Sequence, residues 1–283
     1  MATNKLGMWM PNGKNYWGDK RYEMIRSMGF DYVDIDFLSS RSIYYNTPKD
    51  ELRQLLREEK ALADAAGVIV NQVHGPWRWP AKDSTPEDRA ERMDKMKWSI
   101  EMGAILGSKN WVIHPIMPFG VEESGTPQAQ DTWDMNMVFM SEILAEAKKY
   151  DMTVCLENTP YPNFSLGKSA DVLRFVKAMN DDHFKMCLDT GHTACCGSNR
   201  PGDEVRLIGD EVRVVHIHDN NGKQDQHNMP YFGVVDWQDF GAALREIDFQ
   251  GVFSYEVLFY SSLPPHHAQA LCERMATMAK EIF

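Results

Sequence analysis

Four short apolar segments in the second half of the chain constrain its fold most, because each ends in acidic residues or histidines. They are residues 154–159, 186–192, 214–220 and 252–257. Side chains alternate between the two faces of a β-strand, so these segments would present four ligand-type residues on one face: Glu157, Asp189, His216 and Glu256. A closed parallel barrel brings the C-terminal ends of its strands around one point, where such barrels keep their chemistry. The pattern therefore predicts a polar site at the mouth of a barrel.

The rest of the chain continues the same alternation of strands and helices. Strands are expected over residues 6–10, 31–37, 68–74 and 111–115, followed by four that end at Glu157, Asp189, Asp219 and Glu256. Helices are expected over residues 16–28, 47–66, 85–106, a segment ending near Tyr150, 170–179, 204–208, 236–247 and 267–282. Eight strand–helix units are typical of a (β/α)8 barrel. We predict an α/β fold, a single TIM barrel domain spanning residues 1–283.

Composition and charge narrow the possible partners. Hydrophobic residues make up 43% of the chain, and no apolar segment approaches the roughly 20 residues that span a bilayer. The first residues lack the features of a signal peptide, so we expect a cytoplasmic protein without a membrane partner. The five cysteines are an odd number and favour free thiols. The net charge of −11 argues against a nucleic-acid partner, because phosphate binding needs clustered lysines and arginines.

Six of the nine histidines fall at strand ends or in loops on the same predicted barrel face: His74, His114, His192, His216, His218 and His227. A single histidine of this kind is more often a hydrogen-bonded structural residue. Here they accompany Glu157, Asp189 and Glu256, and such a set without lysine or arginine partners is electrostatically costly unless a cation lies among it. The clustering predicts a bound divalent metal.

These residues also carry a family resemblance. Leu-Glu-Asn at 156–158, Leu-Asp-Thr-Gly-His at 188–192, His-Ile-His-Asp at 216–219, Asp225-Gln-His227 and Glu256 resemble the xylose isomerase-like barrel superfamily. That superfamily includes sugar isomerases and epimerases and also endonuclease IV. In its ketose 3-epimerase branch one divalent ion, often manganese, is held by Glu, Asp, His and Glu at the ends of strands five to eight. The resemblance therefore implies a metal, manganese first and cobalt, magnesium or zinc as alternatives, on Glu157, Asp189, His216 and Glu256.

The strand-seven ligand has two candidates, because His216 and His218 point to the same side of a strand. The family ligand usually stands three residues before an acid, and Asp219 stands three after His216. We therefore favour His216 as the ligand. His218 would then contact substrate or support the metal ligands.

The residue types suit proton transfer next to a carbonyl. Inverting or moving a hydroxyl there requires loss of a proton on one face and its return on the other, and we assign Glu157 and Glu256 as base and acid. A metal would stabilise the enediolate charge. The expected substrate is a small sugar contacted by six side chains: His74, Trp77, His114, His192, His218 and His227. Trp77 and Trp79 would form an apolar wall for the sugar or its aglycone, or instead cover the barrel mouth or a contact in a homo-oligomer.

Two features favour other functions. Ketose 3-epimerases commonly carry an arginine shortly after the strand-seven histidine, whereas residues 219–224 read Asp-Asn-Asn-Gly-Lys-Gln, which argues against a free ketohexose. Endonuclease IV holds three zinc ions with nine ligands. This chain has residues of the same types in the same order: the four predicted metal ligands together with His74, His114, His192, Asp225 and His227. A zinc-dependent phosphodiesterase or abasic-site endonuclease is thus the alternative. A keto-sugar or keto-inositol dehydratase or lyase, and a non-catalytic sugar-binding barrel, also remain open.

Overall fold

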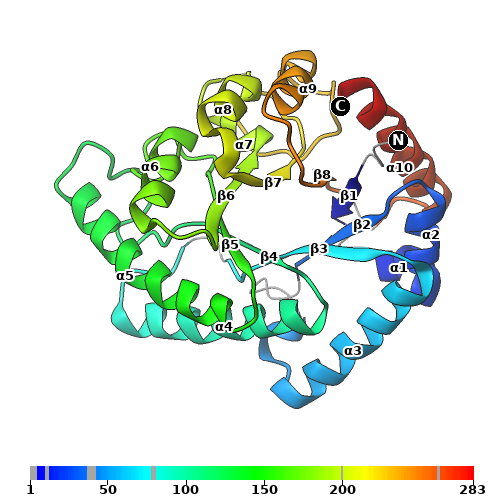
Figure 1. The fold of residues 1–283 in the computed structure, drawn as a ribbon, viewed down its shortest axis with the longest axis horizontal. Helices are drawn as coiled ribbons and strands as arrows, with labels where there is room; N and C mark the ends of the chain where they lie inside the picture. Colours follow the sequence, from blue (N-terminus) through cyan, green and yellow to red (C-terminus); the bar gives the residue numbers. More distant parts are fainter. Residues whose placement is uncertain (1–4, 10–12, 37–42, 78–80, 199, 260–261) are drawn as a thin grey trace.

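The computed structural model describes residues 5–9, 13–36, 43–77, 81–198, 200–259 and 262–283. Eight parallel strands form a ring with helices outside it (Figure 1). The strands are β1 (Leu6–Trp9), β2 (Tyr32–Ile35), β3 (Ile69–His74), β4 (Asn110–Ile113), β5 (Thr153–Glu157), β6 (Phe184–Asp189), β7 (Val212–His216) and β8 (Phe253–Tyr255). Neighbours in the chain pair with one another, and β8 pairs with β1. The ring closes where Ile217 donates to Ser254 O at 2.9 Å and accepts from Glu256 N at 3.0 Å.

Helices connect successive strands and cover the outside of the ring (Figure 1). The α-helices are α1 (Gly13–Trp17), α2 (Arg21–Ser27), α3 (Lys49–Ala66), α4 (Pro86–Ile105), α5 (Gln128–Lys148), α6 (Ser169–Met179), α7 (Thr190–Cys195), α8 (Pro201–Ile208), α9 (Trp237–Glu246) and α10 (Pro265–Ile282). Short 3-10 helices are η1 (Gly18–Lys20), η2 (Ile43–Asn46) and η3 (Gly209–Glu211). The predicted (β/α)8 barrel is confirmed.

Local sequence signals explain where several helices begin and end. Thr85 caps α4 by accepting a hydrogen bond from Asp88 N at 3.1 Å, and Pro86 occupies the first turn, where its missing N–H costs nothing. Gly67 ends α3 with φ +68°, a left-handed conformation that favours glycine. These signals place the helix ends within the predicted segments.

The structure corrects three predicted elements and adds one helix. The continuous helix over residues 16–28 is wrong, because Gly18 at φ +54° separates α1 from α2. The seventh strand ends at His216 rather than Asp219, and the eighth ends one residue before Glu256. Helix α7 was not predicted; it begins where Asp189 accepts a hydrogen bond from His192 N. The predicted strand ends at Met10 and Phe37 lie outside the described residues.

A small buried layer lies directly below the mouth of the barrel. It consists of Val112, Cys155, Cys187 and Val214. Three of these residues stand two positions before Glu157, Asp189 and His216, and the alternation of a strand sends both members of each pair to the same face. This layer is the floor on which the polar residues of the mouth stand.

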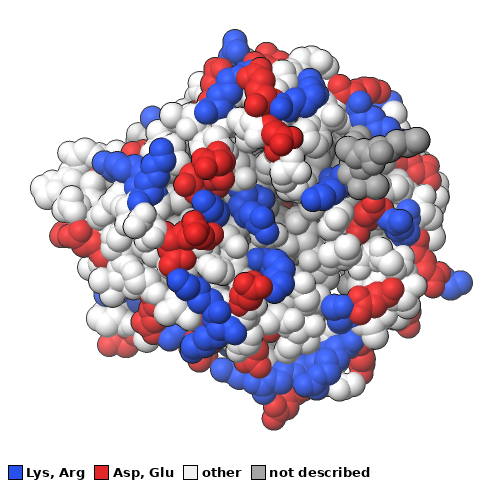
Figure 2. All heavy atoms as spheres, viewed as in Figure 1, with Lys and Arg blue, Asp and Glu red and all other residues white. Residues whose placement is uncertain are grey.

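Acidic and basic side chains are interspersed on the face of the molecule seen in Figure 2, so neither sign of charge predominates there. In the part of the chain that the structure describes, no helix is both long and apolar enough to cross a membrane. All five cysteines are free thiols, as predicted.

Candidate active site

The four residues predicted to hold a metal converge at the mouth. One donor atom from each of Glu157, Asp189, His216 and Glu256 lies within 4.8 Å of the others. The register explains this arrangement, because Glu157 pairs with Cys187 on β6 and Asp189 pairs with His216 on β7. Parallel strands in this register deliver their last side chains to one place.

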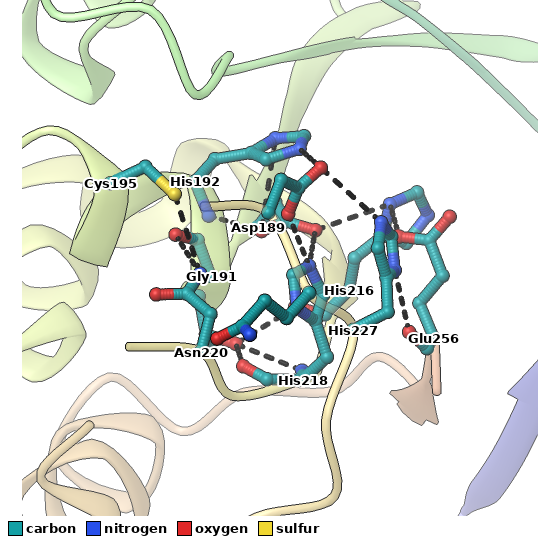
Figure 3. Close-up of polar contacts among 12 residues, drawn as sticks. Asp189, Gly191, His192, Cys195, His216, His218, Asn220, His227 and Glu256 are labelled. Atoms are coloured by element: carbon teal, nitrogen blue, oxygen red, sulfur yellow. Dashed lines mark hydrogen bonds and ion pairs between the residues drawn. The ribbon is translucent and has the colours of Figure 1, made fainter. Parts of the chain in front are cut away.

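His216 contacts the carboxylates of this group; Asp189 and Glu256 lie near it in Figure 3. Its Nδ1 is 2.7 Å from Glu157 Oε1, 3.1 Å from Glu256 Oε2 and 3.9 Å from Asp189 Oδ2. Burial opposes a positive charge on the ring, but the nearby Cys187, Glu256 and Glu157 groups raise the pKa of His216 well above its usual value. A positive charge on this ring compensates the charges of the surrounding carboxylates.

The neighbouring histidines lower the pKa values of the two glutamates. Burial would raise the pKa of Glu157, but His216 and His114 hold it well below the usual value. The pKa of Glu256 is likewise lowered, because His216 and His227 outweigh the effect of burial. Both carboxylates are therefore ionised at neutral pH.

The donor set fits a divalent cation. Glu157 is 1% exposed and directs one oxygen to His216, while the other lies 3.2 Å from His74 Nε2 and 2.9 Å from His114 Nε2. His114 Nε2 is buried and makes no well-aligned hydrogen bond in the structure. Carboxylate oxygens with imidazole nitrogens are ligands that manganese and zinc accept, so the residues present suit the predicted metal.

Asn158 and helix α7 fix the orientation of Asp189. Asn158 Oδ1 accepts from Asp189 N at 2.8 Å, and its Nδ2 donates to Asp189 O at 3.1 Å. Asp189 Oδ1 accepts from His192 N at 2.6 Å, which leaves Oδ2 beside His218 Nε2 at 3.0 Å. Outer contacts of this kind hold a ligand in one orientation.

A second group of ligand-type residues lies beside the first (Figure 3). His192 Nε2 and His227 Nε2 lie 3.2 and 3.3 Å from Asp225 Oδ2. The ring of His218 stacks on that of His227 with centroids 4.0 Å apart. Burial opposes charge on His227, but Asp225 and Glu256 raise its pKa to about 10. His218 therefore belongs mainly to this second group, whereas His216 belongs to the four-residue set.

The third group contains His74, His114 and Glu157. The two rings meet edge to face with centroids 5.2 Å apart. Trp77, which is 40% exposed, packs edge to face on His114 with centroids 6.1 Å apart. The structure thus brings all the predicted site histidines, Asp225 and Trp77 to the mouth, while Trp79 lies outside the described residues.

Two residues with a positioning role were not assigned one from the sequence. Asn158 directly follows Glu157, and this adjacency was the available signal. Asp219 is fully buried and accepts hydrogen bonds from Asn220 N, Val235 N and Trp237 Nε1. It thereby fixes the loop that carries Asp225 and His227, a role visible only in the tertiary structure.

Known proteins resemble this chain in sequence and fold. Residues 22–278 match the family described as xylose isomerase-like TIM barrel. An uncharacterised protein of Methanocaldococcus jannaschii is 29% identical over 65% of this chain and 63% of its own length. The D-psicose 3-epimerase of Enterocloster bolteae is 24% identical over 89% of this chain and 81% of its own. A probable endonuclease 4 of Mycoplasmopsis agalactiae is 23% identical over 64% and 66%. The chain thus spans less than two thirds of the length of the Methanocaldococcus jannaschii protein and of the probable endonuclease 4.

Two solved structures have the same architecture. A D-tagatose 3-epimerase-like protein superposes with a TM-score of 0.73 at 24% identity, covering 98% of both chains. The IOLI protein, crystallised with a zinc atom, superposes with a TM-score of 0.76 at 19% identity, covering 99% of both chains. At these identities the likeness establishes the fold.

Proposed function

The chain belongs to the xylose isomerase-like TIM barrel family, and we propose that it is a divalent-metal-dependent isomerase or epimerase of a keto-sugar or keto-sugar derivative. The observation that carries the proposal is the convergence of Glu157 and Glu256 on one nitrogen of His216, at 2.7 and 3.1 Å. Two carboxylates at one small centre suit a reaction that removes a proton and returns it. The likeness to a D-psicose 3-epimerase over 89% of the chain supports this reaction class.

The metal would be held by Glu157, Asp189, His216 and Glu256, whose donor atoms lie within 4.8 Å of one another. When bound, a divalent cation would supply Lewis acidity toward the carbonyl group of the substrate. Manganese is the first choice, with cobalt, magnesium and zinc as alternatives.

The two glutamates differ in their access to solvent. The side chain of Glu157 is 1% exposed, whereas that of Glu256 is 18% exposed. Both are ionised, so each accepts a proton from the carbon next to the carbonyl when that carbon faces it. A proton held by Glu256 exchanges with water more readily than one held by Glu157. Epimerisation would use one glutamate on each face of the carbon: the ionised one would accept the proton, and the other, after first taking up a proton, would return one to the opposite face.

The remaining mouth residues would contact and orient the sugar: His74, Trp77, His114, His192, His218 and His227. Five of them line a pocket that encloses about 80 Å³ of free space and also includes Tyr161, whereas His218 is fully buried and does not line it. Imidazole groups donate or accept hydrogen bonds to hydroxyls, and the indole of Trp77 offers an apolar face. The proposal includes one barrel domain over residues 1–283, a cytoplasmic location, no nucleic-acid partner and a possible homo-oligomer.

A second candidate, zinc-dependent phosphodiester hydrolysis, has its own supporting observation. The nine residues that match endonuclease IV by type and order all lie in the three neighbouring groups at the mouth. A probable endonuclease 4 is among the relatives. The net charge of −11 weighs against a nucleic-acid substrate, because such binding rests on basic surface.

Metal content and proton exchange test the two candidates together. Mass spectrometry of the purified protein gives the metal and its stoichiometry, and NMR follows solvent deuterium entering a panel of keto-sugars. We expect about one manganese, cobalt or magnesium ion per chain and deuterium at the carbon next to the carbonyl. Two or three zinc ions without exchange on any sugar would contradict the proposal, and cleavage of abasic-site DNA would then support the second candidate. Exchange accompanied by loss of water would indicate a dehydratase.

A further inference from the structure

An apolar groove lies beside the candidate active site. It encloses about 390 Å³ of free space between the β7–α9 loop and the segment that follows β8. Its apolar lining includes Met229, Phe232, Val257, Leu258, Phe259 and Leu263. Phe232 is 68% exposed and Leu258 is 41% exposed. Apolar side chains that gather in an open groove mark a binding surface more often than isolated ones do.

His227 joins the groove to the metal-site pocket. It lines both cavities. Its Nδ1 lies 2.8 Å from the carbonyl oxygen of Glu256, and its own carbonyl accepts from Leu258 N at 3.0 Å. Glu256, which follows β8 and would transfer a proton, is thus two positions from the exposed Leu258. The groove begins where the polar pocket ends.

The chemistry of the two cavities differs sharply. The metal-site pocket encloses only about 80 Å³ and contains Glu157, Asp225 and Glu256. Among the described residues that line the groove, none is Asp, Glu, Lys or Arg. A free sugar is rich in hydroxyl groups and would gain less from this surface than an apolar group would. An aryl or alkyl group would remove the apolar side chains from water.

We infer that the groove binds the apolar aglycone of a glycoside whose keto-sugar ring lies in the metal-site pocket. The inference rests on the proposed function and makes its substrate class specific: a keto-glycoside with an aromatic or aliphatic aglycone. Continuity through His227 favours this occupant over a second copy of the chain, because one molecule would reach both cavities.

Binding of matched glycosides tests the inference without turnover. Isothermal titration compares the methyl and phenyl β-glycosides of 3-keto-glucose, 3-keto-galactose and 3-keto-mannose on the full chain loaded with manganese. We expect the phenyl member of at least one pair to bind roughly tenfold more tightly, as burial of an aromatic ring predicts. Phe232→Ser and Leu258→Ser should each abolish that preference. Leu207→Ser is the matched control, because Leu207 is 51% exposed on α8, outside the groove.

Two outcomes would overturn the inference. One is equal binding, or no binding, of the phenyl and methyl members in every pair. The other is a wild-type dimer in analytical ultracentrifugation that Leu258→Ser dissociates, with no aglycone preference, because the groove would then be a subunit contact. Deuterium exchange on aglycone-free keto-sugars by the wild-type protein tests the proposed function separately, so the two failures are distinguishable.

Discussion

A Cβ atom at Gly191 would lie 2.0 Å from Cε1 of His218, so the imidazole ring occupies the space that a side chain would need. The ring is fully buried and lies 3.0 Å from Asp189 Oδ2. The glycine in the first turn of α7 therefore permits the stacked arrangement of His218 and His227.

Gly191→Ala should displace His218 and destabilise the protein. Overpacking of this kind costs about 1–3 kcal/mol, and the displaced ring would disturb Asp189. The expected result is a lower melting temperature and weaker metal binding. The double variant with His218→Ala supplies the control: if the clash is the cause, adding Gly191→Ala to His218→Ala should cost much less. If Gly191→Ala lowered the stability equally with and without His218→Ala, the clash with His218 would not be the cause.

Glu157→Gln and Glu256→Gln should each reduce deuterium exchange about 10²–10⁴-fold at saturating manganese, because a neutral amide cannot accept the proton. Circular dichroism should show that both variants remain folded. Glu142→Gln is the matched control, because that glutamate lies on α5 and its side chain is 53% exposed. Wild-type exchange in both site variants would refute the assignment.

Asn158→Ala should weaken metal binding about 10–100-fold, the usual effect of losing an outer contact to a ligand. The substitution removes both side-chain hydrogen bonds that hold the backbone of Asp189. Asn163→Ala is the control, since Asn163 is exposed and its side chain donates to Glu122. Titration of manganese into the metal-free proteins gives both affinities, and unchanged affinity in Asn158→Ala would show that Asp189 needs no such support.

Metal affinity should rise with pH. In the metal-free protein the pKa of His216 is raised well above its usual value, so its ring carries a proton at neutral pH that the metal must displace. Calorimetric titrations in two buffers with different ionisation enthalpies should reveal proton release. An affinity independent of pH would show that a neutral ring already faces the metal.

The stability of the metal-free protein should fall as pH rises above neutrality. The pKa of His227 is raised from 6.5 to about 10, so its contribution is fully present below about pH 6.5 and is lost as pH approaches about 10. Thermal unfolding across this range checks the sign. His227→Gln should flatten the dependence, and His266→Gln, at the exposed start of α10, should leave it unchanged.

Strand alternation determined most of the architecture and the four-residue set. The period of two, together with the position where each apolar segment ends, was enough to place Glu157, Asp189, His216 and Glu256 on one face. The order of strands and helices then predicted the barrel, because parallel strands with right-handed crossovers allow few other topologies.

Tertiary structure decided the features that depend on contacts between distant residues. The break at Gly18 and the capping of α7 by Asp189 were not visible in the periodicity of single segments. Three further features each join different strands and loops. They are the contact of His218 with Asp189, the hydrogen bonds of Asn158 to the backbone of Asp189, and the groove beside His227. Local sequence patterns specify which face a side chain takes, whereas packing between segments specifies the partner it meets. For that reason the sequence by itself determined the fold and the face that carries the four proposed metal ligands, and only the tertiary structure decided their neighbours.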